Sequence, residues 1–158
     1  MALKGGKEIV AALNEVLEGE LAAVNQYFLH AKMLQNWGYA RLYSKVYAES
    51  IDEMKHADAL IERILYLDGL PNVQKIGRVR IGETVPEMFA SDVALEEAAI
   101  PRLQAFVKLC REQEDEGTRA LLSAILVSEE EHLDWLEAQQ TLIKQVGLQN
   151  YLSEQIRE

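Results

Sequence analysis

Residues 51–58 read IDEMKHAD and place Glu53 three positions before His56, in a chain with three histidines in all. On a helix, residues three apart share one face, with their Cβ atoms roughly 5–6 Å apart. The stretch SEEEHLDW at 128–135 repeats this spacing with Glu129 and His132. A carboxylate and an imidazole so placed can bind one metal ion together or can simply share a hydrogen bond. The spacing alone leaves both interpretations open.

The composition favours one soluble globular domain over residues 1–158. Hydrophobic residues make up 49% of the 158 and charged residues 27%, which suits a chain that buries its own core. The net charge of −10 argues against general affinity for nucleic acid or anionic membranes. Cys110 is the only cysteine, so no intrachain disulfide can form. Without a signal-peptide pattern or an apolar run of about 18 residues, we expect a cytoplasmic protein.

Apolar residues recur at spacings of three and four over most of the chain and predict four long helices. Gly38, the pair Asp68-Gly69 and Gly147 are predicted helix ends, and Gly117 a hinge between the last two long helices. Thr84 is a predicted N-cap, with Pro86 in the first turn. The long helices are expected over about 7–37, 40–67, 85–114 and 118–146, with a short fifth helix in the tail.

Four helices of nearly equal length, about 40–45 Å each, predict an all-α four-helix bundle. The stretch GLPNVQKIGRVRIGETVP at 69–86 lacks helical character and is long enough to cross the bundle from end to end. Bundles with one such crossover are of the ferritin-like kind. Pro101 interrupts the third helix and is expected to kink it, or to split it just after Glu96 and Glu97.

Two further acids lie on apolar stripes, where an unpaired carboxylate would be costly to bury. Glu20 follows Val16 and Leu17 by one turn on the first helix, and Glu96 follows Val93 on the third. Each long helix then supplies one inward acid. With the two histidines, they match the known arrangement of di-iron and di-manganese carboxylate bundles. Two divalent cations would balance four carboxylates, and mixed oxygen and imidazole ligands suit iron or manganese.

Other polar residues near these positions have simpler interpretations. His30 has no acid one turn before it on its own helix and is predicted to be structural. Tyr27 is either a packing residue or a neighbour of the metal ligands, since it lies close to the layer of Glu20. Glu130 and Glu131 are predicted to face solvent, because only Glu129 lies three residues before His132.

Five stretches of the chain resemble the bacterioferritins, the haem-containing branch of the ferritins. They are NQYFLH at 25–30, IDEMKHAD at 51–58, LIERILYLDGLPN at 60–72, EEEHLDWLE at 129–137 and GLQNYL at 147–152. The resemblance implies a hollow shell of 24 subunits that stores ferric mineral and detoxifies iron. It also implies a ferroxidase centre in each subunit, which oxidises Fe(II) with O2 or H2O2. Glu53 and Glu129 would bridge two irons, and the full ligand set would be Glu20, Glu53, His56, Glu96, Glu129 and His132.

The same resemblance gives Met54 a role. Helical geometry directs Met54 about 130° away from the mean direction of Glu53 and His56, so it faces out of its own bundle. By its position alone, Met54 could simply pack at a subunit interface. In bacterioferritins this position supplies the axial ligand of a haem b shared by two subunits. That haem would carry electrons from a ferredoxin-like donor to the mineral and assist iron release.

The sequence also departs from the family pattern. Ala48 stands where many members have a histidine associated with an inner-surface iron site, so that site is in doubt. The stretch EQEDEGTRALLSAIL at 112–126 lacks the usual aromatic-rich turn, and Pro101 is unexpected. These features suggest a divergent member, in a shell built either of this chain alone or of this chain with a second subunit type. The alternatives are a di-iron oxidase or peroxidase without storage, and a structural bundle that binds no metal.

Overall fold

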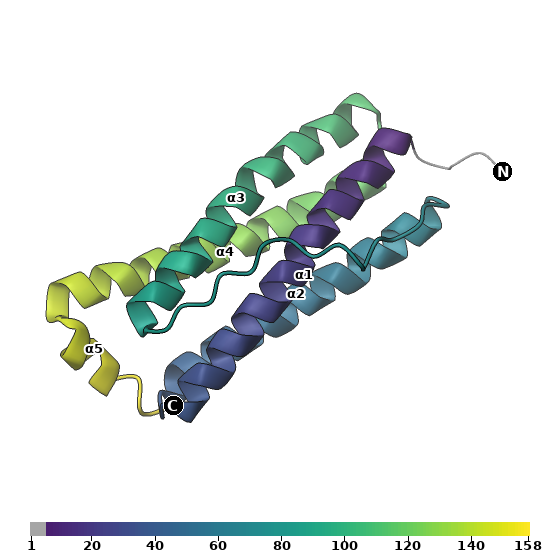
Figure 1. Ribbon diagram of the computed structural model, residues 1–158. Coiled ribbons are helices and arrows are strands. Elements are labelled where there is room, and N and C mark those ends of the chain that lie inside the picture. Colours follow the sequence, from purple (N-terminus) through teal and green to yellow (C-terminus); the bar gives the residue numbers. More distant parts are fainter. Residues whose placement is uncertain (1–5) are drawn as a thin grey trace.

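The computed structural model describes residues 6–158, which contain five helices and no strand. The long helices form two closely packed pairs, α1 with α2 and α3 with α4 (Figure 1). The prediction of an all-α four-helix bundle with one long crossover, the ferritin-like topology, and a short fifth helix is confirmed. The helices are α1 (Lys7–Asn36), α2 (Ala40–Tyr66), α3 (Val85–Glu112), α4 (Glu116–Val146) and α5 (Leu148–Ser153). Within residues 6–158, no helix is both long enough and apolar enough to cross a membrane.

The crossover between α2 and α3 runs along α1 (Figure 1). It is hydrogen-bonded to α1 at successive positions along its length. The backbone N–H of Gly77 donates to the carbonyl of Glu18 at 3.1 Å. Further along, the N–H of Arg80 donates to Oε1 of Gln26 at 3.0 Å, and the N–H of Gly82 donates to Nε2 of His30 at 3.0 Å. These bonds satisfy backbone groups of a segment that has no regular structure of its own.

Most predicted helix ends are found where the sequence placed them. The Thr84 hydroxyl accepts a hydrogen bond from the N–H of Glu87, and Pro86 lies in the first turn of α3. Gly38 and Gly147 have φ angles of 88° and 85°, the left-handed conformation that favours glycine. After α2, however, Asp68 has the positive φ, at 62°. Gly69 serves close packing instead, since a Cβ there would lie 2.7 Å from Cγ1 of Val10.

One prediction about the second helix pair is wrong, and one of the two alternatives for Pro101, a split of the helix, is excluded. Gly117 is not a hinge, because it lies in the first turn of α4. The turn is made by Glu114, with a φ of 57°, and by Asp115, whose Oδ1 accepts hydrogen bonds at 3.0 Å from the N–H of Thr118 and from Nη2 of Arg63. The expected split at Pro101 is also absent, because α3 continues through it. Pro101 is exposed, so water can satisfy the backbone carbonyl that loses its helical partner.

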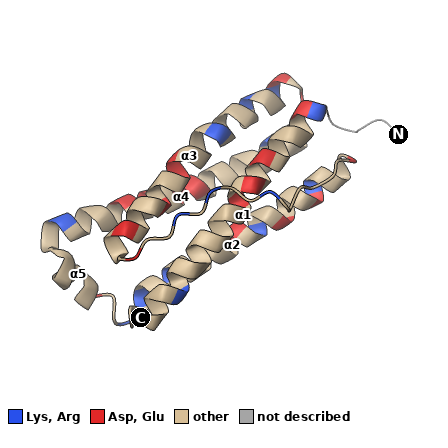
Figure 2. Cartoon of the chain, viewed as in Figure 1, with Lys and Arg blue, Asp and Glu red and all other residues tan. Residues whose placement is uncertain are grey.

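The core consists of two apolar clusters with a polar layer between them. One cluster contains Leu17 of α1 and Leu60 of α2, and the other contains Ala31 of α1 and Leu42 of α2. Along α1, Glu20 comes after Leu17 of the first cluster and before the residues of the second. Figure 2 shows Asp and Glu, in red, on all four long helices. The bundle therefore supports an internal acidic layer from both sides with packed side chains.

Candidate metal centre

Six side chains from the four long helices meet in the middle layer of the bundle. Their ligand atoms form two overlapping groups, and within each group all atoms lie within 4.8 Å of one another. Glu53 and Glu129 belong to both groups. One group adds Glu20 and His56, and the other adds Glu96 and His132. The structure thus brings together all six residues that the sequence singled out as ligands.

Both imidazoles turn the same ring atom toward the carboxylates. Nδ1 of His56 lies 3.4 Å from Glu129 and 3.6 Å from each of Glu53 and Glu20. Nδ1 of His132 lies 3.0 Å from Glu53, with Glu96 and Glu129 at 3.8 and 3.9 Å. Each histidine therefore faces three carboxylates, two of which are shared.

The other ring nitrogen of His132 has a partner of its own. Nε2 of His132 lies 3.4 Å from Oδ2 of Asp52, a partly exposed carboxylate on α2. A carboxylate behind an imidazole fixes the orientation of the ring and leaves the opposite nitrogen free to bind a metal. Asp52 was not among the site residues predicted from the sequence, although Asp52 lies directly before Glu53 in the stretch IDEMKHAD.

The centre contains many buried polar atoms without a hydrogen-bond partner. They are Oε2 of Glu20, both oxygens of Glu53, Oε2 of Glu96, Oε1 of Glu129, and Nδ1 of His56 and His132. Buried polar atoms are normally satisfied, and each exception requires an explanation. Four carboxylates and two imidazoles left open at one place fit a pair of divalent cations in charge and in donor type.

The pKa values show how strongly these groups interact. Burial by itself raises the pKa of Glu53, but the nearby imidazoles of His132 and His56 outweigh it and lower the pKa to about 2. Burial lowers the pKa of His132, but the carboxylates of Glu53 and Glu96 outweigh it and raise the pKa to about 11. Burial, and then the charge of Glu53, raises the pKa of Glu129 well above its usual range. Without a metal at neutral pH, His132 is thus protonated, and Glu129 binds a proton more tightly than an exposed glutamate does.

Tyr27 contacts the centre directly. Its hydroxyl donates a hydrogen bond to Oε1 of Glu96, and its ring meets that of His132 edge-on, with centroids 6.2 Å apart. Tyr27 is fully buried, and burial followed by the charge of Glu96 raises its pKa well above 10. Tyr27 therefore remains a hydrogen-bond donor that holds one oxygen of Glu96 in place.

A second buried polar network lies beside the centre and involves no metal-ligand candidate. Nδ1 of His30 donates to Oδ1 of Asp92 at 3.0 Å, and Nε2 of Gln26 donates to the same oxygen at 2.8 Å. Because the N–H of Gly82 can only donate, Nε2 of His30 must be the acceptor, which leaves the proton on Nδ1. Both nitrogens of His30 are engaged, which agrees with its predicted structural role. Its acid comes from α3, which no spacing within α1 could reveal.

Glu49 is the buried acid that the sequence analysis missed. It lies one turn before Glu53 on α2, is 1% exposed, and has neither oxygen in a hydrogen bond. Burial raises its pKa to about 8, although Nζ of Lys45 lies 3.8 Å away. Glu20 was predicted because it is an acid on the apolar stripe of its helix, and the same criterion applied to α2 would have identified Glu49. By contrast, Glu130 and Glu131 face solvent as predicted.

Comparison with known proteins places this geometry in context. The family described as ferritin-like domain matches residues 10–146. The chain is 46% identical to a bacterioferritin of Mycobacterium leprae and to bacterioferritin BfrA of Mycobacterium tuberculosis, over 94% of each chain. It is 44% identical to a bacterial ferritin of Synechocystis, over 98% of this chain and 99% of the relative.

Binding of a divalent cation at this centre is expected to release protons at pH 7. The pKa of His132 is raised to about 11, so its ring holds a proton at pH 7 that a bound metal must displace, and the raised pKa of Glu129 acts in the same direction. Addition of Co(II) to metal-free protein in a weakly buffered solution with an indicator dye measures the release. Glu130→Gln, an exposed neighbour, should release the same number. Co(II) binding without proton release would contradict these protonation states.

Proposed function

The chain belongs to the bacterioferritins within the ferritin-like family, and from this premise we propose that it is a cytoplasmic iron-storage protein that oxidises Fe(II) before storing it. The observation that carries the proposal is the pair of overlapping four-residue groups joined by Glu53 and Glu129. Two metal positions that share two carboxylates would hold two Fe(II) ions close together, which suits a reaction that draws one electron from each. The proposed ferroxidase centre is the layer of six side chains described above.

Each ligand has a proposed position in the centre. Glu20 and His56 would bind one Fe(II), and Glu96 and His132 the other. Glu53 and Glu129 would bridge the two ions, because only they belong to both groups. The four carboxylates would offset the charge of two Fe(II) ions, which lowers the cost of holding them in a buried layer.

The surrounding residues prepare the centre for its substrate. Asp52 orients the ring of His132, and Tyr27 orients Glu96 through its hydroxyl. Two Fe(II) ions supply two electrons, which reduce O2 to H2O2, or H2O2 to two waters, with uptake of two protons. The apolar clusters on both sides limit the access of bulk water to the layer. The ferric product then passes to a mineral store.

Storage requires an enclosed volume, and we propose that 24 copies of the chain, alone or with a second subunit type, enclose it. Large apolar side chains remain exposed on α2 and on the crossover, which suits surfaces covered by neighbouring copies. They include Ile51, Met54, Leu65, Leu70, Val73 and Ile76.

Met54 supports a haem proposal. Among the methionines in residues 6–158, Met54 is half exposed on α2, whereas Met33 is partly buried and Met88 fully buried. An exposed thioether fits an axial haem ligand shared between two copies. Bound there, haem b would supply electron transfer from a ferredoxin-like donor toward the ferric store.

Glu129→Gln is expected to slow Fe(II) oxidation by roughly tenfold or more, because the amide keeps the shape of the side chain but removes the bridging charge. The rate is measured from the absorbance of the ferric product after mixing with Fe(II) in air. Glu130→Gln removes the same charge one residue away, on the exposed side of α4, and should leave the rate unchanged. Equal rates in both variants would exclude Glu129 from the centre.

Met54→Leu is expected to abolish haem binding, since leucine keeps the apolar volume and loses the sulfur. The measurement is the haem absorbance per chain of protein purified after expression with ample haem supply. Met33→Leu makes the same change at a partly buried position of α1 and should retain haem. Full haem content in the Met54 variant would refute the ligand assignment.

A further inference from the structure

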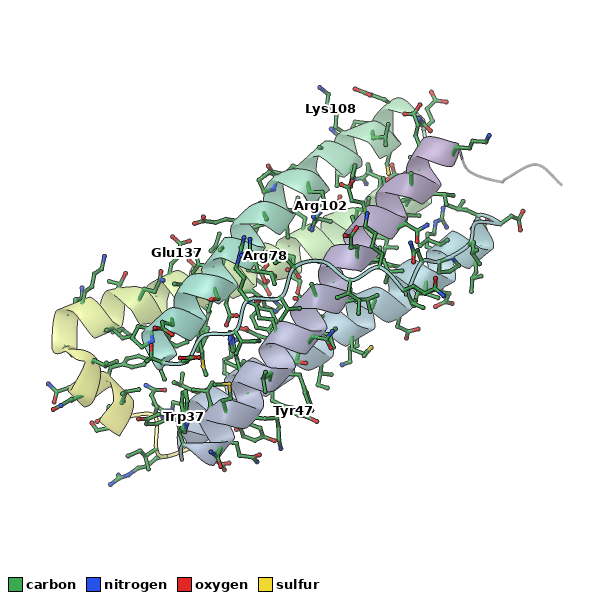
Figure 3. All side chains as sticks on the ribbon, in the orientation of Figure 1. Trp37, Tyr47, Arg78, Arg102, Lys108 and Glu137 are labelled. Carbon is green, nitrogen blue, oxygen red and sulfur yellow. The ribbon has the colours of Figure 1, made fainter. Side chains whose placement is uncertain are left out.

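Arg102 of α3 lies across the backbone of α1 at Gly19 (Figure 3). A Cβ on residue 19 would clash with Nη2 of Arg102 and would lie 3.3 Å from its Cζ. The guanidinium therefore occupies the space that any other residue at position 19 would fill. Gly19 is also the residue directly before Glu20, so this contact lies beside the proposed metal centre.

A small cavity under Arg102 extends from this contact to the centre. Its volume is about 20 Å³, and it is lined by Arg102 and Gly19 together with Glu20 and Glu129. Its remaining walls are apolar and include the small side chains Ala23 and Ala99. Such a volume holds about one water molecule, so a hydrated metal ion cannot pass while the guanidinium is in place.

Arg102 is partly buried and forms no ion pair with the residues that the structure describes. Nε of Arg102 is buried and makes no hydrogen bond. An unsatisfied buried donor destabilises the fold. A methionine or leucine could fill the same space without that penalty, so packing alone does not account for an arginine here.

We propose that Arg102, seated on Gly19, is a gate on a passage between α1 and α3 by which divalent cations reach the carboxylates of the metal centre. The inference rests on the proposed metal centre. In the closed position seen here, the guanidinium narrows the passage, and its positive charge opposes an approaching cation. Arginine has a long flexible side chain, so rotation toward solvent opens the passage without movement of either helix.

The gate is tested by the rate at which Co(II) binds to the metal-free protein, followed by its visible absorbance after rapid mixing. Arg102→Ala removes both the obstruction and the charge and should bind Co(II) roughly tenfold faster than the unaltered chain. Gly19→Ala keeps the charge but displaces the guanidinium, and it too should bind faster. Alanine is favoured over glycine inside a helix, so this variant should fold.

Lys108→Ala is the matched control, since Lys108 is an exposed cation further along α3 (Figure 3). It should bind at the unaltered rate, and all variants should bind the same amount of Co(II) at equilibrium. An unchanged or slower rate in Arg102→Ala would overturn the gate, as would an equal acceleration in Lys108→Ala. In those cases the metal centre would stand, because Co(II) still binds. Failure of the unaltered chain to bind Co(II) would remove the metal centre and the gate with it.

Discussion

Four carboxylates buried at one level of an apolar bundle are the constraint on which the structure depends. Each long helix contributes one of them, so the helices must be similar in length and aligned in register. Buried like charges repel one another and are poorly solvated, which is why the pKa of Glu129 is raised and a proton is held on His132. The apolar clusters on either side supply the packing that holds this layer together. Burying these carboxylates costs free energy, and cations bound to their unpaired oxygens would offset that cost.

A second buried network fixes the position of the layer. Asp92 on α3 accepts hydrogen bonds from Gln26 and His30 on α1, and these two residues also receive the N–H groups of Arg80 and Gly82. The network therefore joins the two helix pairs and holds the crossover in the same place. Because Asp92 lies one turn before Glu96, it sets the height of α3 relative to α1. The crossover is thus more than a connection, since its backbone completes the polar contacts that align the metal ligands.

Helical periodicity and ligand spacing were sufficient to predict the bundle, its crossover and the six side chains that the structure brings together. They succeeded because a helix converts a spacing of three into a shared face, as at Glu53 and His56. Contacts between helices could not be derived in this way: Asp92 reaches His30 from another helix, and Asp52 lies behind His132. The turn at Glu114 was also misplaced, because glycine is the usual signal for a left-handed residue and Gly117 stood nearby. The position of Arg102 could not be predicted either, because it packs against the backbone of Gly19 on another helix and no residue spacing indicates that contact.

The bundle is proposed to oxidise iron at its centre and to store the product. Iron retained per chain, after aerobic loading with excess Fe(II) and removal of unbound metal, tests it most directly. A storage protein should retain far more than the two irons that six ligands can hold. Retention near two per chain would contradict storage and would favour a di-iron oxidase or peroxidase on the same bundle. Retention of none would contradict the metal centre itself.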